Sequence, residues 1–176
     1  MTRLRILRLL APPLFTAALA FATVRTDYDH HANFGRYHTY SWTAIQAGDS
    51  LWQERIQKAV DSELAARGWR RVPSGGSATI CAASQTTERD TVQTIYSNFP
   101  AWGFDGFGAS FGTATTYVIP ESVGNLVVDI FDASDKRLIW RGMASKVLSS
   151  RPNRNIAKLN RAVAEMFKRF PPAAKD

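Results

Sequence analysis

Residues 126–144 read LVVDIFDASDKRLIWRGMA, and this stretch predicts a β-hairpin. Residues 126–131 alternate as a strand does, residues 132–135 form a polar turn, and residues 137–144 return. Because side chains alternate across a strand, one face of the first strand is wholly apolar, with Leu126, Val128 and Ile130. Its other face is mixed, with Val127, Asp129 and Phe131. The hairpin therefore predicts a sheet with one buried face.

Two amphipathic helices are predicted on either side of this hairpin in the sequence. The first covers about residues 51–67, with Ser50 and Gln53 at capping-box spacing before it and Gly68 as its stop. The second opens at an Asn153 cap after Pro152 and ends at Pro171. Each carries an apolar stripe at helical spacing, Trp52, Ile56, Val60 and Leu64 in the first and Ile156, Leu159, Val163, Met166 and Phe170 in the second.

The remaining segments supply further strands. Residues 24–28 and 37–42 predict two short strands, residues 69–72 and 77–96 predict more, and residues 116–119 lead through Pro120 and Gly124 into the hairpin. Long hairpins without regular strand–helix alternation indicate an α+β fold. We expect a two-layer sandwich, a largely antiparallel sheet of about five to six strands with both helices on one face. The other face would be open to water, to a second copy or to a partner.

The N-terminal segment has the pattern of a cleaved signal peptide over residues 1–22. Arg3, Arg5 and Arg8 precede an uncharged stretch, and Ala20-Phe21-Ala22 is a small-x-small cleavage site. The uncharged stretch contains two prolines and is shorter than a membrane-spanning helix requires. We therefore expect export to the periplasm and one α+β domain over residues 23–176.

Charge and cysteine content limit the alternatives. The formal net charge is +7, of which the three leader arginines form part, so an exported domain would be mildly basic. This basicity suits solubility, or contact with anionic envelope components, better than nucleic-acid binding. Cys81 is the one cysteine, so no internal disulfide forms, and no cysteine follows the leader to carry a lipid anchor. We expect Cys81 to be a small core residue of a buried strand.

Motifs for catalysis or cofactor binding are absent from the sequence, and no cofactor is expected. The best polar cluster is Asp27, Asp29 and His31, which strand alternation would place on one side as weak candidate metal ligands. The alternative is that Asp29 caps a turn and the histidines are exposed.

Residues 97–116 form the one compositionally biased segment, a predicted loop rich in glycine and aromatic residues. Its large apolar side chains are candidate partner-binding residues, namely Trp102, Phe104, Phe107 and Phe111. The alternative is a connection whose aromatic rings lie against the open sheet face.

Two separated motifs point to a family. The first is Asp27-Tyr28-Asp29 followed by Phe34, Tyr37, Thr39, Tyr40 and Trp42; the second is GNLVVDIFD at residues 124–132 with LIWRG at residues 138–142. In this order they resemble the bacterial domain-of-unknown-function family numbered 4136, over nearly all of the chain after the leader. The resemblance implies a Gram-negative envelope protein, often a lipoprotein, with no agreed activity. Without a cysteine after the leader, a soluble periplasmic form is favoured, with outer-membrane association as a variant.

Three functions follow from these observations. The leading hypothesis is a non-enzymatic envelope module that binds a protein, lipid or glycan component through the open sheet face and residues 102–111, with peripheral membrane contact as a variant. The second is a metal-dependent or hydrolytic envelope enzyme that uses Asp27, Asp29 and His31. The third is a homo-oligomer that self-associates through the open face.

Overall fold

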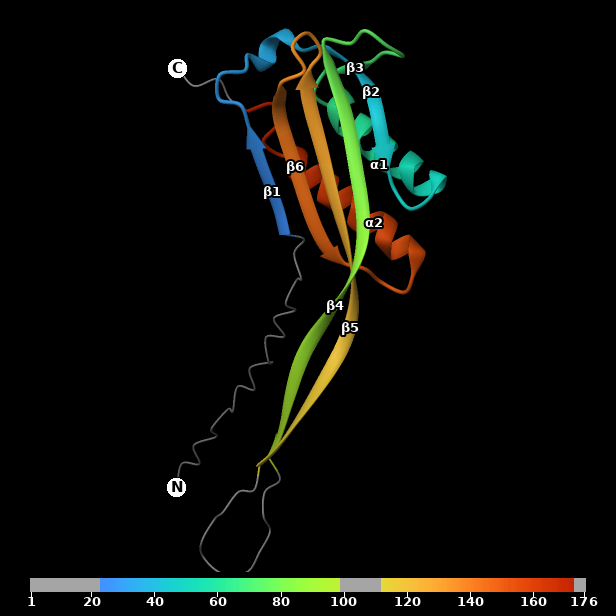
Figure 1. The fold of residues 1–176 in the computed structure, drawn as a ribbon, viewed down its shortest axis with the longest axis vertical. Coiled ribbons are helices and arrows are strands. Elements are labelled where there is room, and N and C mark those ends of the chain that lie inside the picture. The colour runs from blue at the N-terminus through green and yellow to red at the C-terminus, as the bar shows by residue number, and fades with distance from the viewer. Residues whose placement is uncertain (1–22, 99–111, 173–176) are drawn as a thin grey trace, which may run out of the picture.

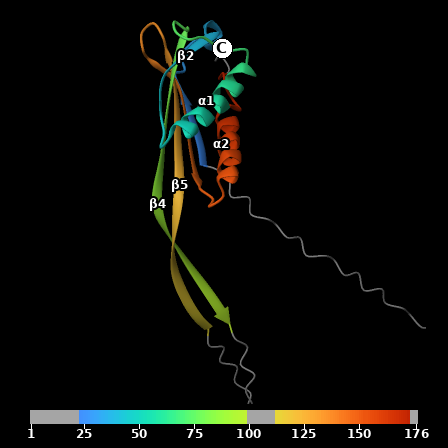
Figure 2. The ribbon, with the colours of Figure 1, turned by 90° about the vertical axis from the view of Figure 1, so that its right-hand side faces the viewer.

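The computed structural model describes residues 23–98 and 112–172, which form one six-stranded sheet and two helices (Figure 1). The strands are β1 (Thr23–Tyr28), β2 (Thr39–Gln46), β3 (Arg70–Arg71), β4 (Ala78–Asn98), β5 (Gly112–Asp132) and β6 (Leu138–Val147). The helices are α1 (Ser50–Ala65) and α2 (Pro152–Phe167), and a short 3-10 turn covers Phe34–Arg36. Figure 2 shows both helices on the same face of the sheet, which confirms the predicted two-layer α+β fold.

The strand order is β1-β6-β5-β4-β2-β3. Along the order β1-β6-β5-β4 each strand is antiparallel to the next, whereas β2 runs parallel to both β4 and β3. The predicted hairpin lies within β5 and β6, and its register places Val128 opposite Gly142 and Asp129 opposite Arg141. The sheet is therefore mixed, with an antiparallel centre.

The core lies between this sheet and the two helices. Leu126, Val128 and Ile130 are all buried, as their alternation predicts. The helices contribute two buried stripes, Ile56, Val60 and Leu64 from α1, and Leu159, Val163 and Met166 from α2. The apolar stripes of the two helices thus pack against the apolar face of the sheet in one buried layer.

The N-terminal caps of both helices differ from the prediction. Asp49, not Ser50, caps α1, because its side chain accepts a hydrogen bond from the backbone N–H of Trp52 at 2.7 Å. The second helix starts at Pro152, with Arg151 at the cap position, so the expected Asn153 cap is wrong. A proline is suited to the first position of a helix, because the N–H that it lacks would have no helical partner there. Gly68 has the left-handed conformation that the sequence predicts, with φ of 81°.

Aromatic rings close the end of the core beyond α2. This helix ends at Phe167, earlier than expected, yet Phe170 is buried among four rings, those of Phe34, Trp69, Trp140 and Phe167. Arg67 donates hydrogen bonds to the backbone carbonyls of Phe167 and Phe170. These bonds satisfy acceptors that the helix end leaves without partners.

The predicted interruption at Pro120 and Gly124 is wrong, because β5 is continuous from Gly112 to Asp132. Pro120 lies beyond the point where β5 pairs with β6, and an edge position tolerates a missing N–H. Gly124 leaves room for Leu148, since a Cβ there would lie 2.9 Å from Leu148 Cδ2. The predicted loop at residues 97–116 is shortened at both ends by strand residues.

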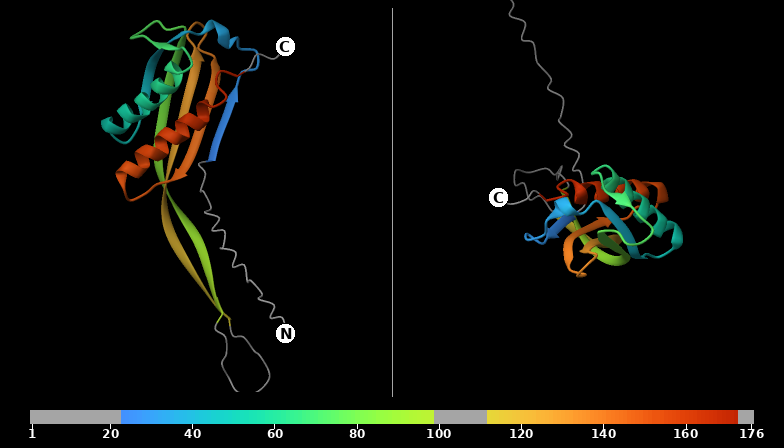
Figure 3. Two further views of the ribbon diagram at one scale, coloured as in Figure 1. Left: turned by 180° about the vertical axis from the view of Figure 1, so that it is seen from behind. Right: turned by 90° about the horizontal axis from the view of Figure 1, so that it is seen from above.

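The outer parts of β4 and β5 form a ribbon that we call the arm, defined as residues 88–98 and 112–122. Pairing runs without interruption from Glu88 opposite Ser122 to Asn98 opposite Gly112. The neighbouring strands stop earlier, because β2 reaches β4 only at Ala83 and β6 reaches β5 only at Val123. Figure 3 shows the arm projecting beyond both layers.

Candidate interaction surface

The arm exposes large apolar side chains on both of its faces. Val92 and Val118 are directly opposite each other, so they share one face, and they are 65% and 61% exposed. Tyr117 and Ile119 lie on the other face and are 51% and 42% exposed. These four residues account for most of the exposed large hydrophobic side chains in the described part of the chain.

One arm face continues onto the open face of the sheet. Side chains two positions apart share a face, so Tyr117, Ile119, Val123 and Val127 lie in one row along β5, with Glu121 and Asn125 between them. Met143 and Val147 of β6 lie opposite Val127 and Val123, and both are exposed. We call these six apolar residues the open-face stripe. The twist of the ribbon carries this row around the arm.

A charged pair marks the centre of the open face. The Arg141 guanidinium binds both carboxylate oxygens of Asp129, through Nε and Nη2, each at 2.6 Å. Asp129 is 8% exposed, so the arginine covers it, and the hydrogen bonds to Asp129 raise the pKa of Arg141. The bidentate geometry makes this pair a cross-strand clamp.

Cys81 lies opposite Asp129 on the same face and is partly exposed. The prediction that it is a core residue is therefore wrong, because the neighbouring Ile80 and Ala82 occupy the buried face. Partial burial and the Asp129 charge raise the pKa of the Cys81 thiol. A thiol held protonated is a poor nucleophile.

The candidate metal ligands are not assembled into a site. Strand β1 ends at Tyr28, and Asp29 accepts a hydrogen bond from the backbone N–H of His31 at 2.8 Å and faces Arg137. The backbone bond to His31 and the Arg137 charge lower the pKa of Asp29. Across residues 23–98 and 112–172, no three His, Cys, Asp or Glu side chains are grouped so that they could hold a metal ion. Asp29 thus has the turn role that its alternative interpretation predicts.

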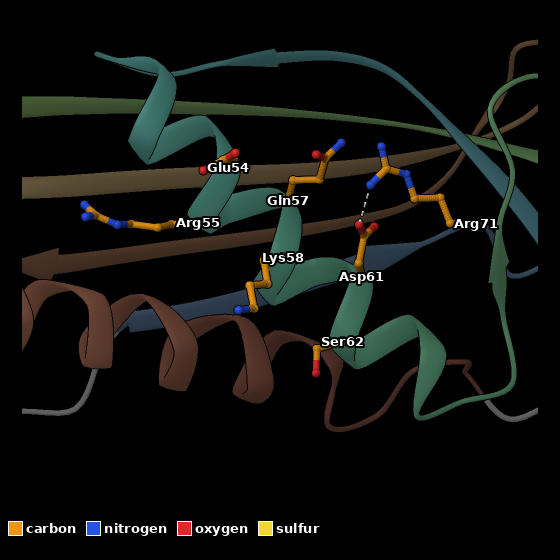
Figure 4. A pocket seen from close by; sticks show the side chains of 7 residues that line it. All are labelled: Glu54, Arg55, Gln57, Lys58, Asp61, Ser62 and Arg71. Atoms are coloured by element: carbon orange, nitrogen blue, oxygen red, sulfur yellow. Dashed lines mark hydrogen bonds and ion pairs between the residues drawn. The ribbon is translucent and has the colours of Figure 1, made fainter.

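A shallow polar hollow of about 780 Å³ lies over the outer face of α1 (Figure 4). Its one carboxylate with several partners is Asp61, which accepts hydrogen bonds from Tyr40 Oη at 2.7 Å, Trp42 Nε1 at 2.9 Å and Arg71 Nη1 at 3.0 Å. Burial and the Asp61 contact raise the pKa of Tyr40. These bonds join α1 to β2 and β3, so Asp61 has a structural role here.

The aromatic candidates Trp102, Phe104, Phe107 and Phe111 lie outside the described residues. The sequence predicts strands at residues 77–96 and 116–119 on either side of them, and what it missed is that these strands extend to Asn98 and Gly112 and pair as one ribbon. The sequence contains a signal for these longer strands, because residues 91–98 and 112–119 are rich in Thr, Val, Ile and Tyr and contain no charged residue.

Within residues 23–98 and 112–172, neither helix combines the length and hydropathy that a membrane span requires.

Comparison with known proteins identifies a family and a fold. The family model "Domain of unknown function (DUF4136)" matches residues 24–172. Among solved structures, a PDZ domain protein from Parabacteroides distasonis is similar at 15% identity and a TM-score of 0.60, over 88% of this chain and 36% of that chain. The chain thus spans about a third of that protein's length. At this identity the likeness concerns the fold alone.

Two further structures are more weakly similar. A PelC dodecamer from Paraburkholderia phytofirmans has 15% identity and a TM-score of 0.47, over 84% of this chain and 97% of that chain. A minor lipoprotein from Acinetobacter baumannii has 12% identity and a TM-score of 0.38, over 76% of this chain and 92% of that chain. No curated protein matches the chain.

Proposed function

The chain belongs to the DUF4136 family, and from that premise we propose that it is a non-enzymatic binding module of the cell envelope. Its binding surface is the arm together with the open-face stripe. The observation that carries this proposal is the exposure of Val92, Tyr117, Val118 and Ile119 on a ribbon that has no neighbouring strand among the described residues.

Two physical arguments support a binding role for the arm. An isolated two-stranded ribbon is only marginally stable in water, so a long regular one gains from contact with another molecule. Large apolar side chains gathered on one exposed element are also typical of interaction sites. Among the residues of β4 and β5 whose burial is described, those of the core lie in the inner halves of the two strands.

The proposed location is the periplasm. The leader pattern of residues 1–22 supports export. The absence of a cysteine after the leader supports a form without an N-terminal lipid.

The hydrogen bonds made by four aspartates support a binding protein over an enzyme. Asp29, Asp61, Asp129 and Asp132 are all held in hydrogen bonds that join structural elements or fix turns. A catalytic carboxylate would need a free oxygen in a cleft that a substrate can reach.

In-cell photo-crosslinking tests the proposal. A photoreactive amino acid at Tyr117 should give a discrete adduct to one envelope protein, lipid or glycan, and a second position at Phe107 tests the aromatic segment. The matched control is Leu51, which is also exposed, at 61%, but lies at the start of α1. The proposal fails if Tyr117 and Phe107 give no adduct in exported, folded protein, or if Leu51 gives the same adducts.

A further inference from the structure

The outer edges of the arm have no pairing partner among the described residues. Strand β4 loses its β2 neighbour after Ala83, and β5 has no β6 neighbour before Val123. Each strand of the arm therefore presents one row of backbone N–H and C=O groups to the outside, and these two rows lie on opposite sides of the ribbon.

These edges lack the features by which proteins usually prevent strand pairing. The charged residues and the proline of the described arm lie at its root, between Glu88 and Asp90 and at Pro120 and Glu121. The outer half, residues 91–98 and 112–119, has neither. Uncharged segments rich in Thr, Val, Ile and Tyr favour pairing with another strand.

The other edges of the same sheet are protected. Strand β1 carries Arg25 and Asp27 within its short length, and β3 consists of Arg70 and Arg71 alone. Strand β2 has an irregular register between Trp42 and Ala44, of the kind that discourages further pairing. The contrast sets the outer half of the arm apart from the body of the sheet.

We propose that the free β5 edge of one arm pairs antiparallel with the free β4 edge of a second copy. The strand order β4-β5-β4-β5 then continues from copy to copy, with all arms pointing the same way. A second copy fits because one arm carries both complementary edges, uncharged over the same length and antiparallel to each other. An unrelated strand would use only one of them.

This contact is head to tail, so the assembly is a closed ring or an open chain rather than a symmetric dimer. Thr94 and Thr116, whose hydroxyl oxygens lie 3.2 Å apart within one arm, suit threonine pairing between arms as well. The arm faces with Val92 and Val118, or with Tyr117 and Ile119, stay available. The inference therefore goes beyond the proposed function, since the edges bind copies and the faces bind the partner.

Disulfide trapping between copies tests this arrangement. In a Cys81→Ser background, Val92→Cys protein is mixed with Val118→Cys or Thr116→Cys protein, and the mixture is oxidised. Adjacent strands lie about 4.8 Å apart and alternate strands about twice that, beyond the reach of a disulfide. At least one mixture should form disulfide-linked dimers, whereas each variant alone and a Leu51→Cys control should not.

Light scattering on the exported protein gives the second measurement. We expect a mass several times that of one chain, and the mass of one chain when residues 89–121 are replaced by an Asn-Gly turn. A monomeric exported protein, or equal disulfide formation in the unmixed samples, would overturn the inference. A monomer that still gives the Tyr117 adduct in cells would leave the proposed function standing, so the two failures are distinguishable.

Discussion

At the scale of single residues, Gly142 explains part of the LIWRG motif. A Cβ at this position would lie 2.5 Å from the Trp140 ring and 3.1 Å from Met166 Sδ, because the indole folds over the glycine. We expect Gly142→Ala to lower the free energy of unfolding by about 1–3 kcal/mol through overpacking. Denaturant unfolding measures this change. Gly48→Ala is the control, since nothing lies within 4 Å of a Cβ there, and an equal loss in both variants would contradict the argument.

Arg141 is the other decisive residue of that motif. Arg141→Met leaves the buried Asp129 carboxylate without its two bonds, and we expect a loss of about 1–3 kcal/mol in chemical unfolding. Replacing both partners, with Asp129→Leu added, should recover most of that loss because no unpaired charge remains. Arg25→Met, on exposed β1, should change stability by less than about 0.5 kcal/mol. If the double variant is less stable than Arg141→Met, the argument that Arg141 compensates the buried charge of Asp129 is wrong.

Tyr37 should make the free energy of unfolding depend on pH in the alkaline range. Burial and its 2.8 Å hydrogen bond to Asp132 raise the pKa of Tyr37 from 10 to about 12. The folded state holds this proton more tightly than the unfolded state, so its contribution is complete below pH 10 and is lost as pH rises from 10 to 12. Tyr37→Phe should lose about 1 kcal/mol at neutral pH. The free energies of unfolding of the two proteins, measured at several pH values, should converge above pH 10. A difference that stays constant with pH would argue against the raised pKa of Tyr37.

At the scale of elements, the predictable parts were those with a local cause. Leu126, Val128 and Ile130 alternate with polar or mixed positions, so their burial follows from period-two geometry within one strand. The bond between Asp129 and Arg141 was not predicted, because it requires the register between two strands. Charges facing each other on the mixed sides of the predicted hairpin were the available signal.

The sequence predicts strands at residues 77–96 and 116–119, but their continuation and pairing as the arm were missed for a different reason. Pro120 and Gly124 are usual strand breakers, but a proline is tolerated where no neighbouring strand needs its N–H, and a glycine where another side chain packs above it. Both conditions depend on distant segments, β6 and Leu148. The predicted loop of residues 97–116 therefore took in residues at both ends that belong to β4 and β5, and the exposed residues of the arm were not recognised as candidates.

The arm and the body of the sheet should be energetically separable. Replacing residues 89–121 by an Asn-Gly turn that joins Glu88 to Ser122 removes no residue of the buried core. We expect the melting temperature, measured on dissociated protein, to change by less than about 4 °C. Val128→Ala, in the inner half of β5, should cost about 2 kcal/mol as a control for core damage. A large loss on arm replacement would mean that the arm supports the fold.

At the scale of the whole molecule, the expected cleavage site of the leader can be checked directly. The small-x-small site Ala20-Phe21-Ala22 predicts cleavage after Ala22, and the next residue, Thr23, is paired with Ser145 in the sheet. We therefore expect the exported protein to begin at Thr23, as mass spectrometry of the intact protein would show. Ala22→Asp should block cleavage and keep the chain at the inner membrane, because the small-x-small site is lost. Thr16→Ser should be processed normally.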